Sequence, residues 1–402
     1  MSRQRILILG GSKFQVPLIR RARERGLHVT TCDYLPGNPG HRLADEYHDV
    51  STTDPDGVLA LARRIGIDAI ASMSSDPAMP AVAYVADALG LPGPSPRAIA
   101  TMTRKDAFRR LLSDRGLPVP EFKVFGVGEL AHADDLAAPL ASGAARCVVK
   151  PVDSCGSKGV AVLEPHDDPA PALRIALAQS RAGRCIVERY IDGAHLHGDG
   201  YLRRGRLIHQ YLGDQGFFAG PPNLIPVSTL WPSGQAAAAI SELARQVETI
   251  AQASGYLDGP LNIEARVTPA GEVFVIEIGP RNGGDYIPVI QHRLTGFDFV
   301  ARVLDDALGL ISTAEHAPMK IGIGACYTLH ADRDGIFSGL RVSETIRGNV
   351  FLLEAFRQEG EPVFQHASSN TSLGVVGLEF DNLAERDRLM GDLRSHLVPV
   401  VV

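Results

Sequence analysis

The chain lacks the features that mark nucleic-acid-binding and disulfide-stabilised proteins. Acidic residues outnumber basic ones, 46 to 40, which gives a formal net charge of -6. No run of Lys and Arg interleaved with aromatics occurs, so a nucleic-acid partner is disfavoured. The five cysteines are an odd number without a CxxC pair. They fit reduced thiols better than disulfides or a structural zinc site.

Long apolar runs are also lacking. No stretch approaches the length of a membrane span, and the apolar run near Met1 is too short for the core of a signal peptide. We therefore expect a cytoplasmic protein without a membrane partner. With 402 residues, of which 45% are hydrophobic, the chain has room for two or three domains.

The first 95 residues alternate short apolar runs with amphipathic segments. This order predicts a parallel sheet with right-handed helical crossovers. Ligands of such sheets bind at the carboxyl ends of the strands, which here carry Gly10-Gly11-Ser12 and Ser74-Ser75-Asp76. We expect these loops, and Ser75 and Asp76 in particular, to meet an anionic substrate. The alternative is that they only connect elements.

The segment from Leu261 to Asp285 predicts a β-hairpin that brings two glutamates together. With Val267 opposite Glu272, Glu264 and Glu277 become diagonal neighbours on one face, roughly 7 to 8 Å apart at Cα. Two acids this close repel unless a cation lies between them, and a glutamate in an apolar strand is costly unless it is paired or metal-bound. The pattern indicates a metal site; an edge hairpin with solvated glutamates is the alternative.

Two further stretches carry groups suited to phosphate. Arg281 and Gly283-Gly284 follow the hairpin and offer a guanidinium fork and accessible backbone amides. Upstream, a strand predicted to end at Lys150 leads into the small-residue loop 154–159. Such a loop can fold over phosphates, although a hairpin with a flexible tip fits equally well. Cys155 in this loop is interpreted as a small neutral residue.

Three more positions attract attention. Lys105 lies near the start of a predicted helix, where the helix dipole disfavours a cation, so a nearby anion would explain it. Glu188 ends an apolar strand where the chain turns. His195 and His197 alternate along the next strand, but no third ligand is evident, and a metal site there is disfavoured.

In their order along the chain, these motifs resemble those of ATP-grasp ligases. The helix with Lys105 is followed by VVKPVDSCGSKGV, IVERYIDG, NIEA and EIGPRNGGD. The resemblance covers nearly the whole chain and is greatest to the carbamoyl-phosphate-synthase-like carboxylate-amine ligases. It implies a parallel-sheet α/β domain at 1–95, an ATP-grasp domain of two antiparallel sheets at 96–315, and a small α/β domain at 316–402. A homodimer is also expected from this resemblance.

The resemblance further implies that ATP lies between the two antiparallel sheets. Glu188 would accept from the adenine amino group, and His195 would take the place of the acid that usually meets the ribose. Glu264 and Glu277 would bind Mg2+ or Mn2+, with water replacing a third ligand because Gly279 stands where asparagine is usual. The residues implied to bind the nucleotide are Lys105, Lys150, Ser154, Gly156, Ser157, Glu188, Arg189, Tyr190, Ile191 and His195.

The activity implied is ATP-dependent joining of a carboxylic acid to an amine, through an acyl phosphate, with release of ADP and phosphate. Lys150 and Arg281 would provide countercharge, and Arg281 would stabilise the tetrahedral oxyanion with the Gly283 and Gly284 amides. Other ATP-grasp chemistry, such as carboxylation or purine-type ligation, is an alternative, as is a non-catalytic ATP-binding protein. The residues expected to bind the small-molecule acid and amine are Ser75, Asp76, Gly283, Gly284, Asp285 and Arg293.

Overall fold

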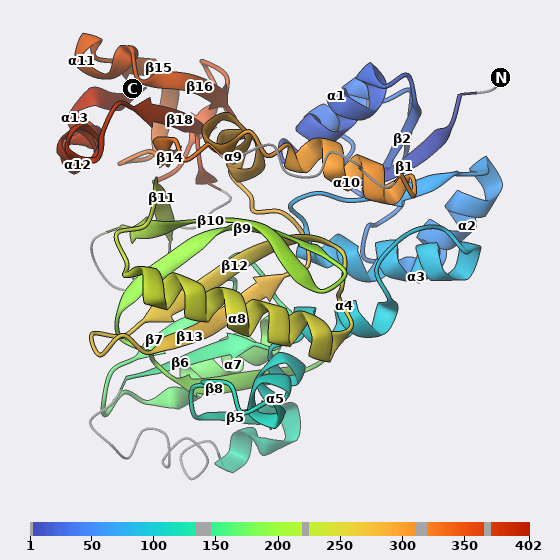
Figure 1. Cartoon of the computed structure of the whole chain (residues 1–402), viewed down its shortest axis with the longest axis horizontal. Coiled ribbons are helices and arrows are strands. Elements are labelled where there is room, and N and C mark those ends of the chain that lie inside the picture. Colours follow the sequence, from blue (N-terminus) through green and yellow to red (C-terminus); the bar gives the residue numbers. More distant parts are fainter. Residues whose placement is uncertain (1–2, 133–145, 219–224, 311–319, 366–370) are drawn as a thin grey trace.

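The computed structural model describes residues 3–132, 146–218, 225–310, 320–365 and 371–402 (Figure 1). The chain begins with a four-stranded sheet of order β3-β2-β1-β4, in which every pair is parallel, as predicted. Its elements are β1 (Arg5–Leu9), α1 (Val16–Glu24), β2 (His28–Cys32), η1 (Pro39–Leu43), β3 (Glu46–His48), α2 (Pro55–Ile65), β4 (Ala69–Ala71), η2 (Asp76–Ala78) and α3 (Met79–Leu89).

Alternation along β1 explains how this sheet is covered. Ile6 and Ile8 face one side and pack with α1 and with α10 (Phe299–Ala307), a helix from much later in the chain. Leu7 and Leu9 face the other side and pack with α2 and α3. Because α10 completes this core, the N-terminal sheet is joined to the later part of the chain by burial as well as by sequence.

A second, small sheet has the order β5-β8-β6-β7 and is antiparallel throughout. Val149 and Val187 of its inner strands pack on the helix α7. The elements of this part are α4 (Pro96–Thr103), α5 (Lys105–Asp114), β5 (Phe122–Gly126), η3 (Val127–His132), β6 (Cys147–Pro151), β7 (Ala161–Leu163), α7 (Pro169–Gln179) and β8 (Arg184–Arg189).

The third sheet has eight strands in the order β13-β12-β9-β10-β11-β14-β18-β16, all antiparallel. Helix α8 packs on one face of β12 and β13, which leaves the opposite face toward the small sheet. The strands and helix are β9 (Ala194–Arg203), β10 (Arg206–Phe217), β11 (Pro226–Trp231), α8 (Ala237–Ser254), β12 (Gly259–Val267), β13 (Val273–Gly279), β14 (Ile323–Leu329), β16 (Val350–Ala355) and β18 (Gly374–Phe380). The predicted pair of antiparallel sheets is confirmed.

Three of the C-terminal strands, β14, β18 and β16, continue this sheet, because β14 pairs with β11. The other three form a separate antiparallel sheet of order β17-β15-β19. The boundary predicted at 315/316 lies outside the described residues, and the division into three domains stays a prediction. No helix in the described ranges is long and apolar enough to cross a membrane. The remaining elements are α9 (Ile287–Thr295), β15 (Gly335–Val342), α11 (Glu344–Arg347), β17 (Pro362–Val363), α12 (Leu383–Gly391), α13 (Leu393–His396) and β19 (Leu397–Val401).

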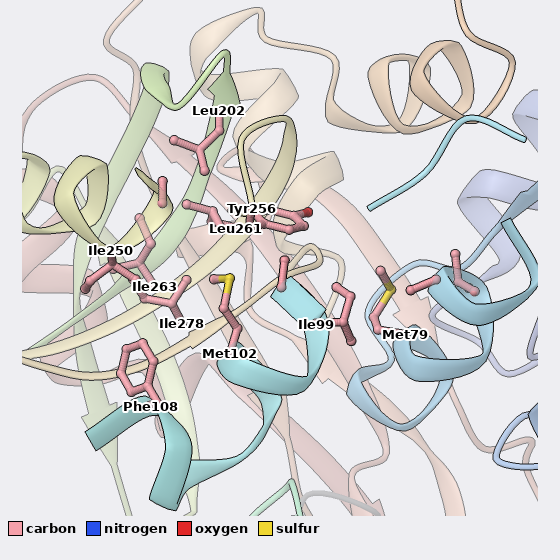
Figure 2. Packing of buried hydrophobic residues seen from close by; sticks show 14 of the residues in the cluster. Met79, Ile99, Met102, Phe108, Leu202, Ile250, Tyr256, Leu261, Ile263 and Ile278 are labelled. Carbon is pink, nitrogen blue, oxygen red and sulfur yellow. The ribbon is translucent and has the colours of Figure 1, made fainter. Parts of the chain in front are cut away.

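One apolar core holds the hairpin of β12 and β13 in place. Figure 2 shows Met79 of α3, Met102 of α4 and Phe108 of α5 together with Ile263 and Ile278 of the hairpin. All of these side chains are buried. The position of the hairpin is therefore fixed against the helices that follow the N-terminal sheet.

Candidate active site

The two glutamates of the hairpin are closer than predicted. Glu264 pairs directly with Glu277, whereas Ala265 pairs with Val275, so Ile276 is an extra residue. The prediction of a diagonal arrangement was wrong because it assumed an unbroken ladder, and a β-bulge re-aims the second glutamate. Like charges directly opposite each other destabilise a sheet, which strengthens the case for a cation between them.

Lys105 supplies the first positive charge beside these glutamates. Its Nζ lies 3.5 Å from Glu277 Oε2 and donates to the carbonyl oxygen of Ser154 at 2.8 Å. Burial lowers the pKa of Lys105, but Glu277 and Asp76 outweigh this, and the net pKa is raised. The position of Lys105 at the start of a helix predicted a nearby anion, and Glu277 is that anion.

His195 lies beside the other glutamate. Its Nε2 is 3.7 Å from Glu264 Oε2, and its ring stacks on Phe217 with centroids 5.1 Å apart. Burial raises the pKa of Glu264, but the neighbouring His195, together with His197 and Arg281, outweighs it, and the net pKa falls to about 2. Glu264 is thus ionised at neutral pH. The role of His195 at a ribose stays a prediction.

A buried group of charges joins the small sheet to α5. Glu188 is 1% exposed, with Arg109 Nε 2.9 Å from its Oε1 and Lys150 Nζ 3.0 Å from its Oε2. Burial raises the pKa of Glu188, but the charges of Arg109 and Lys150 lower it to about 2 overall. Sequence reasoning missed Arg109, although its spacing of four from Lys105 puts both on one helix face.

Arg281 is held by Asp76, which follows β4 of the N-terminal sheet. Its Nε and Nη2 donate to the two oxygens of Asp76 at 2.8 and 2.5 Å, and Nη1 donates to the carbonyl of Asn282. This pair also explains Gly279, because a Cβ there would lie 3.0 Å from both Arg281 Cζ and Asp76 Oδ1. The glycine in place of the usual asparagine therefore makes room for a bidentate ion pair.

The amide of Gly283 is already used. It donates to both oxygens of Asp199, at 2.8 and 3.0 Å. The expectation that the Gly283 amide helps to bind an oxyanion is therefore corrected, whereas that for Gly284 stays a prediction. From the N-terminal domain, Ser74 rather than Ser75 reaches this turn, and its Oγ donates to the Gly283 carbonyl at 2.5 Å.

Asp199 belongs to a buried polar chain that sequence reasoning also missed. Asn262 Nδ2 donates to Asp199 at 3.1 Å and also lies 3.0 Å from His197 Nε2. Because an amide NH2 group can only donate, His197 Nε2 is the acceptor, and His197 Nδ1 therefore carries the proton that it donates to Thr229 Oγ1. Burial lowers the pKa of His197 to about 4, in agreement with a neutral ring. Burial raises the pKa of Asp199 to about 6. In the sequence, polar residues alternate along this strand at His195, His197 and Asp199, and this pattern could have indicated the buried polar chain.

The other predicted nucleotide contacts lie around the small sheet. Gly156 and Ser157 are exposed and have φ of 65° and 58°, as in a tight turn. The amides of Arg189 and Tyr190 donate to the Glu121 and Arg146 carbonyls, so these two N–H groups are already used. That the main chain from Arg189 to Ile191 contacts the nucleotide stays a prediction.

The structure contradicts the predicted role of Arg293 and agrees with the interpretation of Cys155. Arg293 is 60% exposed and pairs with Glu379 at 2.8 Å, so we remove it from the candidate site. Burial raises the pKa of the Cys155 thiol, in agreement with a neutral residue in the loop 154–159. A cavity of about 560 Å³ adjoins this loop and is lined by Asp76, Ser154, Cys155 and Glu277, among others. It has room for a small organic substrate.

The two glutamates suit a hard cation that takes its other ligands from water and from substrate oxygens. Within the described residues, no group of three or more His, Cys, Asp or Glu side chains is arranged to hold a metal. Glu264 and Glu277 provide two carboxylates on paired strands. Mg2+ binds in this way, through one or two carboxylates together with waters and phosphate oxygens.

The comparisons with known proteins agree with this geometry. Residues 144–289 match the family model described as ATP-grasp domain. The formate-dependent phosphoribosylglycinamide formyltransferase of Burkholderia mallei (strain SAVP1) is 33% identical over 205 residues, which cover 47% of this chain and 47% of that protein. The chain thus matches about half the length of this curated relative.

Two solved structures share the fold along the whole chain. The L-amino acid ligase from Bacillus licheniformis has a TM-score of 0.83 and 21% identity, with 100% of both chains covered. The phosphoribosylglycinamide synthetase from Anaerococcus prevotii has a TM-score of 0.78 and 17% identity, again with 100% of both chains covered. Residues 144–289 thus resemble the ATP-grasp domain, the whole chain shares its fold with these two enzymes, and the predicted resemblance is confirmed.

Proposed function

We propose that the protein is an ATP-dependent ligase that joins a carboxylic acid to an amine through an acyl phosphate, with release of ADP and phosphate. The observation that carries this proposal is the direct pairing of Glu264 and Glu277, with Lys105 Nζ 3.5 Å from Glu277 and bonded to the loop at Ser154. Two carboxylates, a buried ammonium and a small-residue loop are what phosphoryl transfer requires. The names of the ligase and synthetase structures support bond formation of this kind.

The residues of the chain would act by position and charge. Mg2+ or Mn2+, held by Glu264 and Glu277, would neutralise the charge of the ATP phosphates. Lys105 and Lys150 would pair with phosphate oxygens. Since Asp76 and the Asn282 carbonyl occupy three of the five guanidinium N–H groups, Arg281 keeps two donors for an oxyanion while Asp76 fixes its orientation.

The remaining expectations rest on the same proposal. Glu188 is buried and both of its oxygens are paired with Arg109 and Lys150, so the expected contact of its side chain with adenine is corrected. His195 would meet the ribose. The partners would be a small-molecule acid and amine, without nucleic acid or membrane, and the protein would be a cytoplasmic homodimer. The non-catalytic alternative rested on Gly279, for which the Arg281–Asp76 pair offers another reason.

An assay of ADP and phosphate release tests the proposed activity. Purified protein with ATP and Mg2+ is screened against organic acids and amines, with and without bicarbonate, and hydroxylamine is added to trap an acyl phosphate as a hydroxamate. We expect ADP release that requires both an acid and an amine, and a hydroxamate when the amine is omitted. Release that requires bicarbonate would indicate carboxylation instead. ATP binding without acceptor-dependent turnover across the screen would contradict an enzyme of this class.

A further inference from the structure

Three distant segments bring a lysine, two aromatic rings and an aspartate together beside the candidate active site. Lys13 follows the glycine turn after β1, and its Nζ donates to Ser372 Oγ at 3.1 Å. The same Nζ lies 3.4 Å from the centroid of the Phe356 ring and 5.0 Å from that of Phe14. Asp285, at the exit of the hairpin, directly precedes Tyr286, whose ring centroid lies 6.3 Å from that of Phe356, and it is the main opposite charge acting on Lys13. We call Lys13, Phe14, Asp285, Phe356 and Ser372 the Lys13 cluster.

The cation in this cluster is incompletely neutralised. Burial lowers the pKa of Lys13 to about 8, and Arg357 acts in the same direction, against the charge of Asp285. No ion pair within 4.0 Å joins Lys13 to Asp285, and none is found for Arg357 in the described part of the chain. Two half-buried cations without a close anion are costly. An anionic group of a ligand would relieve this repulsion.

Asp285 is held in an unfavourable state. Its φ is 49° and that of Tyr286 is 58°, a left-handed conformation that non-glycine residues adopt rarely. Burial raises the pKa of Asp285, and among the described residues its carboxylate accepts no hydrogen bond and has no cation within 4.0 Å. Strain and an unpaired, partly buried carboxylate together are typical of a binding position.

The cluster is connected directly to the groups proposed to act on substrate. Asp285 is four residues beyond Arg281 and two beyond Gly283, whose carbonyl is held by Ser74. The Asp285 carbonyl in turn accepts from Cys326 Sγ at 3.5 Å. A ligand at Asp285 would therefore lie on the same fixed turn as Arg281.

We propose that the Lys13 cluster binds the amine substrate and that this substrate is an α-amino acid. Its ammonium group would donate to Asp285, and its carboxylate would pair with Lys13 and Arg357. The rings of Phe14 and Phe356 would lie beside its side chain. This inference rests on the proposed ligase function and names the substrate class.

The separation of charges favours a zwitterion over other charged ligands. A phosphate or dicarboxylate would meet Lys13 but be repelled by Asp285. A diamine would meet Asp285 but be repelled by Lys13 and Arg357. An α-amino acid carries both charges in one small molecule, and the lysine ammonium retains N–H donors after its bond to Ser372.

The test compares amino acids with their carboxamides as the varied amine in the ADP-release assay. The probes are L-alanine, L-leucine and L-phenylalanine and the three matched amides. We expect Lys13→Gln to raise KM for the amino acid about 10-fold or more and to leave KM for the carboxamide within about 2-fold, because only the former presents a carboxylate. Lys13→Arg should retain most of the affinity. Lys320→Gln, at an exposed lysine, is the matched control.

Asp285→Asn tests the proposed contact between Asp285 and the ammonium group of the amino acid. Asparagine tolerates a left-handed φ, so the turn is kept, and KM should rise about 10-fold or more for amino acid and carboxamide alike, since both carry an ammonium. Asp87→Asn on the surface is the control, and thermal melts verify that each variant is folded. Equal effects of Lys13→Gln on both probe types, no effect, or turnover only with amines that lack a carboxylate would overturn the proposal.

Failure of the ligase function can be told apart from failure of this site. If no pair of acid and amine releases ADP, the proposed function fails, and calorimetric titration with the same six probes then tests the cluster alone. Binding of amino acids that is weakened by Lys13→Gln would support the site. Absence of binding, or binding that Lys13→Gln leaves unchanged, would reject it.

Discussion

Glu277→Gln is expected to lower kcat for ADP release by about 10²- to 10³-fold or more. Glutamine keeps the shape of the side chain but removes the charge that faces both Glu264 and Lys105. Loss of one preorganised charged group in a phosphoryl-transfer site has effects of this size. The measurement is steady-state ADP release with a productive acid and amine, together with the Mg2+ concentration needed for half-maximal rate, which should rise.

Glu272→Gln is the control for that experiment. Glu272 lies at the turn of the same hairpin, is exposed and faces no charged group of the site. Its replacement should leave kcat within about 2-fold, as surface substitutions usually do. A rate for Glu277→Gln within a few fold of the unchanged protein would show that the metal assignment is wrong.

Arg109→Met is expected to cost about 3 to 5 kcal/mol in the free energy of unfolding at pH 7. Arg109 and Glu188 are both 1% exposed, and removal of one partner leaves a buried charge only partly compensated by Lys150. Urea denaturation measures the change. Arg110→Met on the same helix is the control, because the Arg110 side chain is 57% exposed and its pairing contributes little.

This loss should depend on pH in a defined direction. The folded-state pKa of Glu188 is about 2, below the ordinary value of 4.5, so its stabilising contribution is complete above pH 4.5 and is lost as the pH falls toward 2. The difference between Arg109→Met and the unchanged protein should therefore shrink over that range. A difference below about 1 kcal/mol at pH 7, or one that grows in acid, would contradict the assignment of a buried ion pair.

Much of the site could be predicted because its residues lie on strands with strict alternation. The closeness of Glu264 and Glu277 on one hairpin, and the position of Lys150 near the end of a strand, follow from local patterns. The bulge at Ile276 could not be predicted, since the extra residue in an apolar strand has no distinctive side chain. It changed the pairing from diagonal to direct.

Contacts between segments that are distant in sequence explain the other differences. Arg109 looks like a surface residue of an amphipathic helix until β8 places Glu188 against it. The Gly283 amide seemed free because Asp199, 84 positions earlier, gave no local sign of reaching it. Lys13 likewise acquires its environment from Phe356 and Ser372, more than 340 positions away. Long-range placement of this kind depends on topology and not on local sequence.

The continuity of the eight-stranded sheet limits how this chain can be divided. β14 and β18 extend the same sheet that carries the hairpin of β12 and β13. A fragment that stops before β14 would leave the β11 edge unpaired, and the complementary fragment would leave the β14 edge unpaired, which favours aggregation of both. Variants made by truncation, domain exchange or circular permutation should therefore keep the segment from β9 to β18 intact.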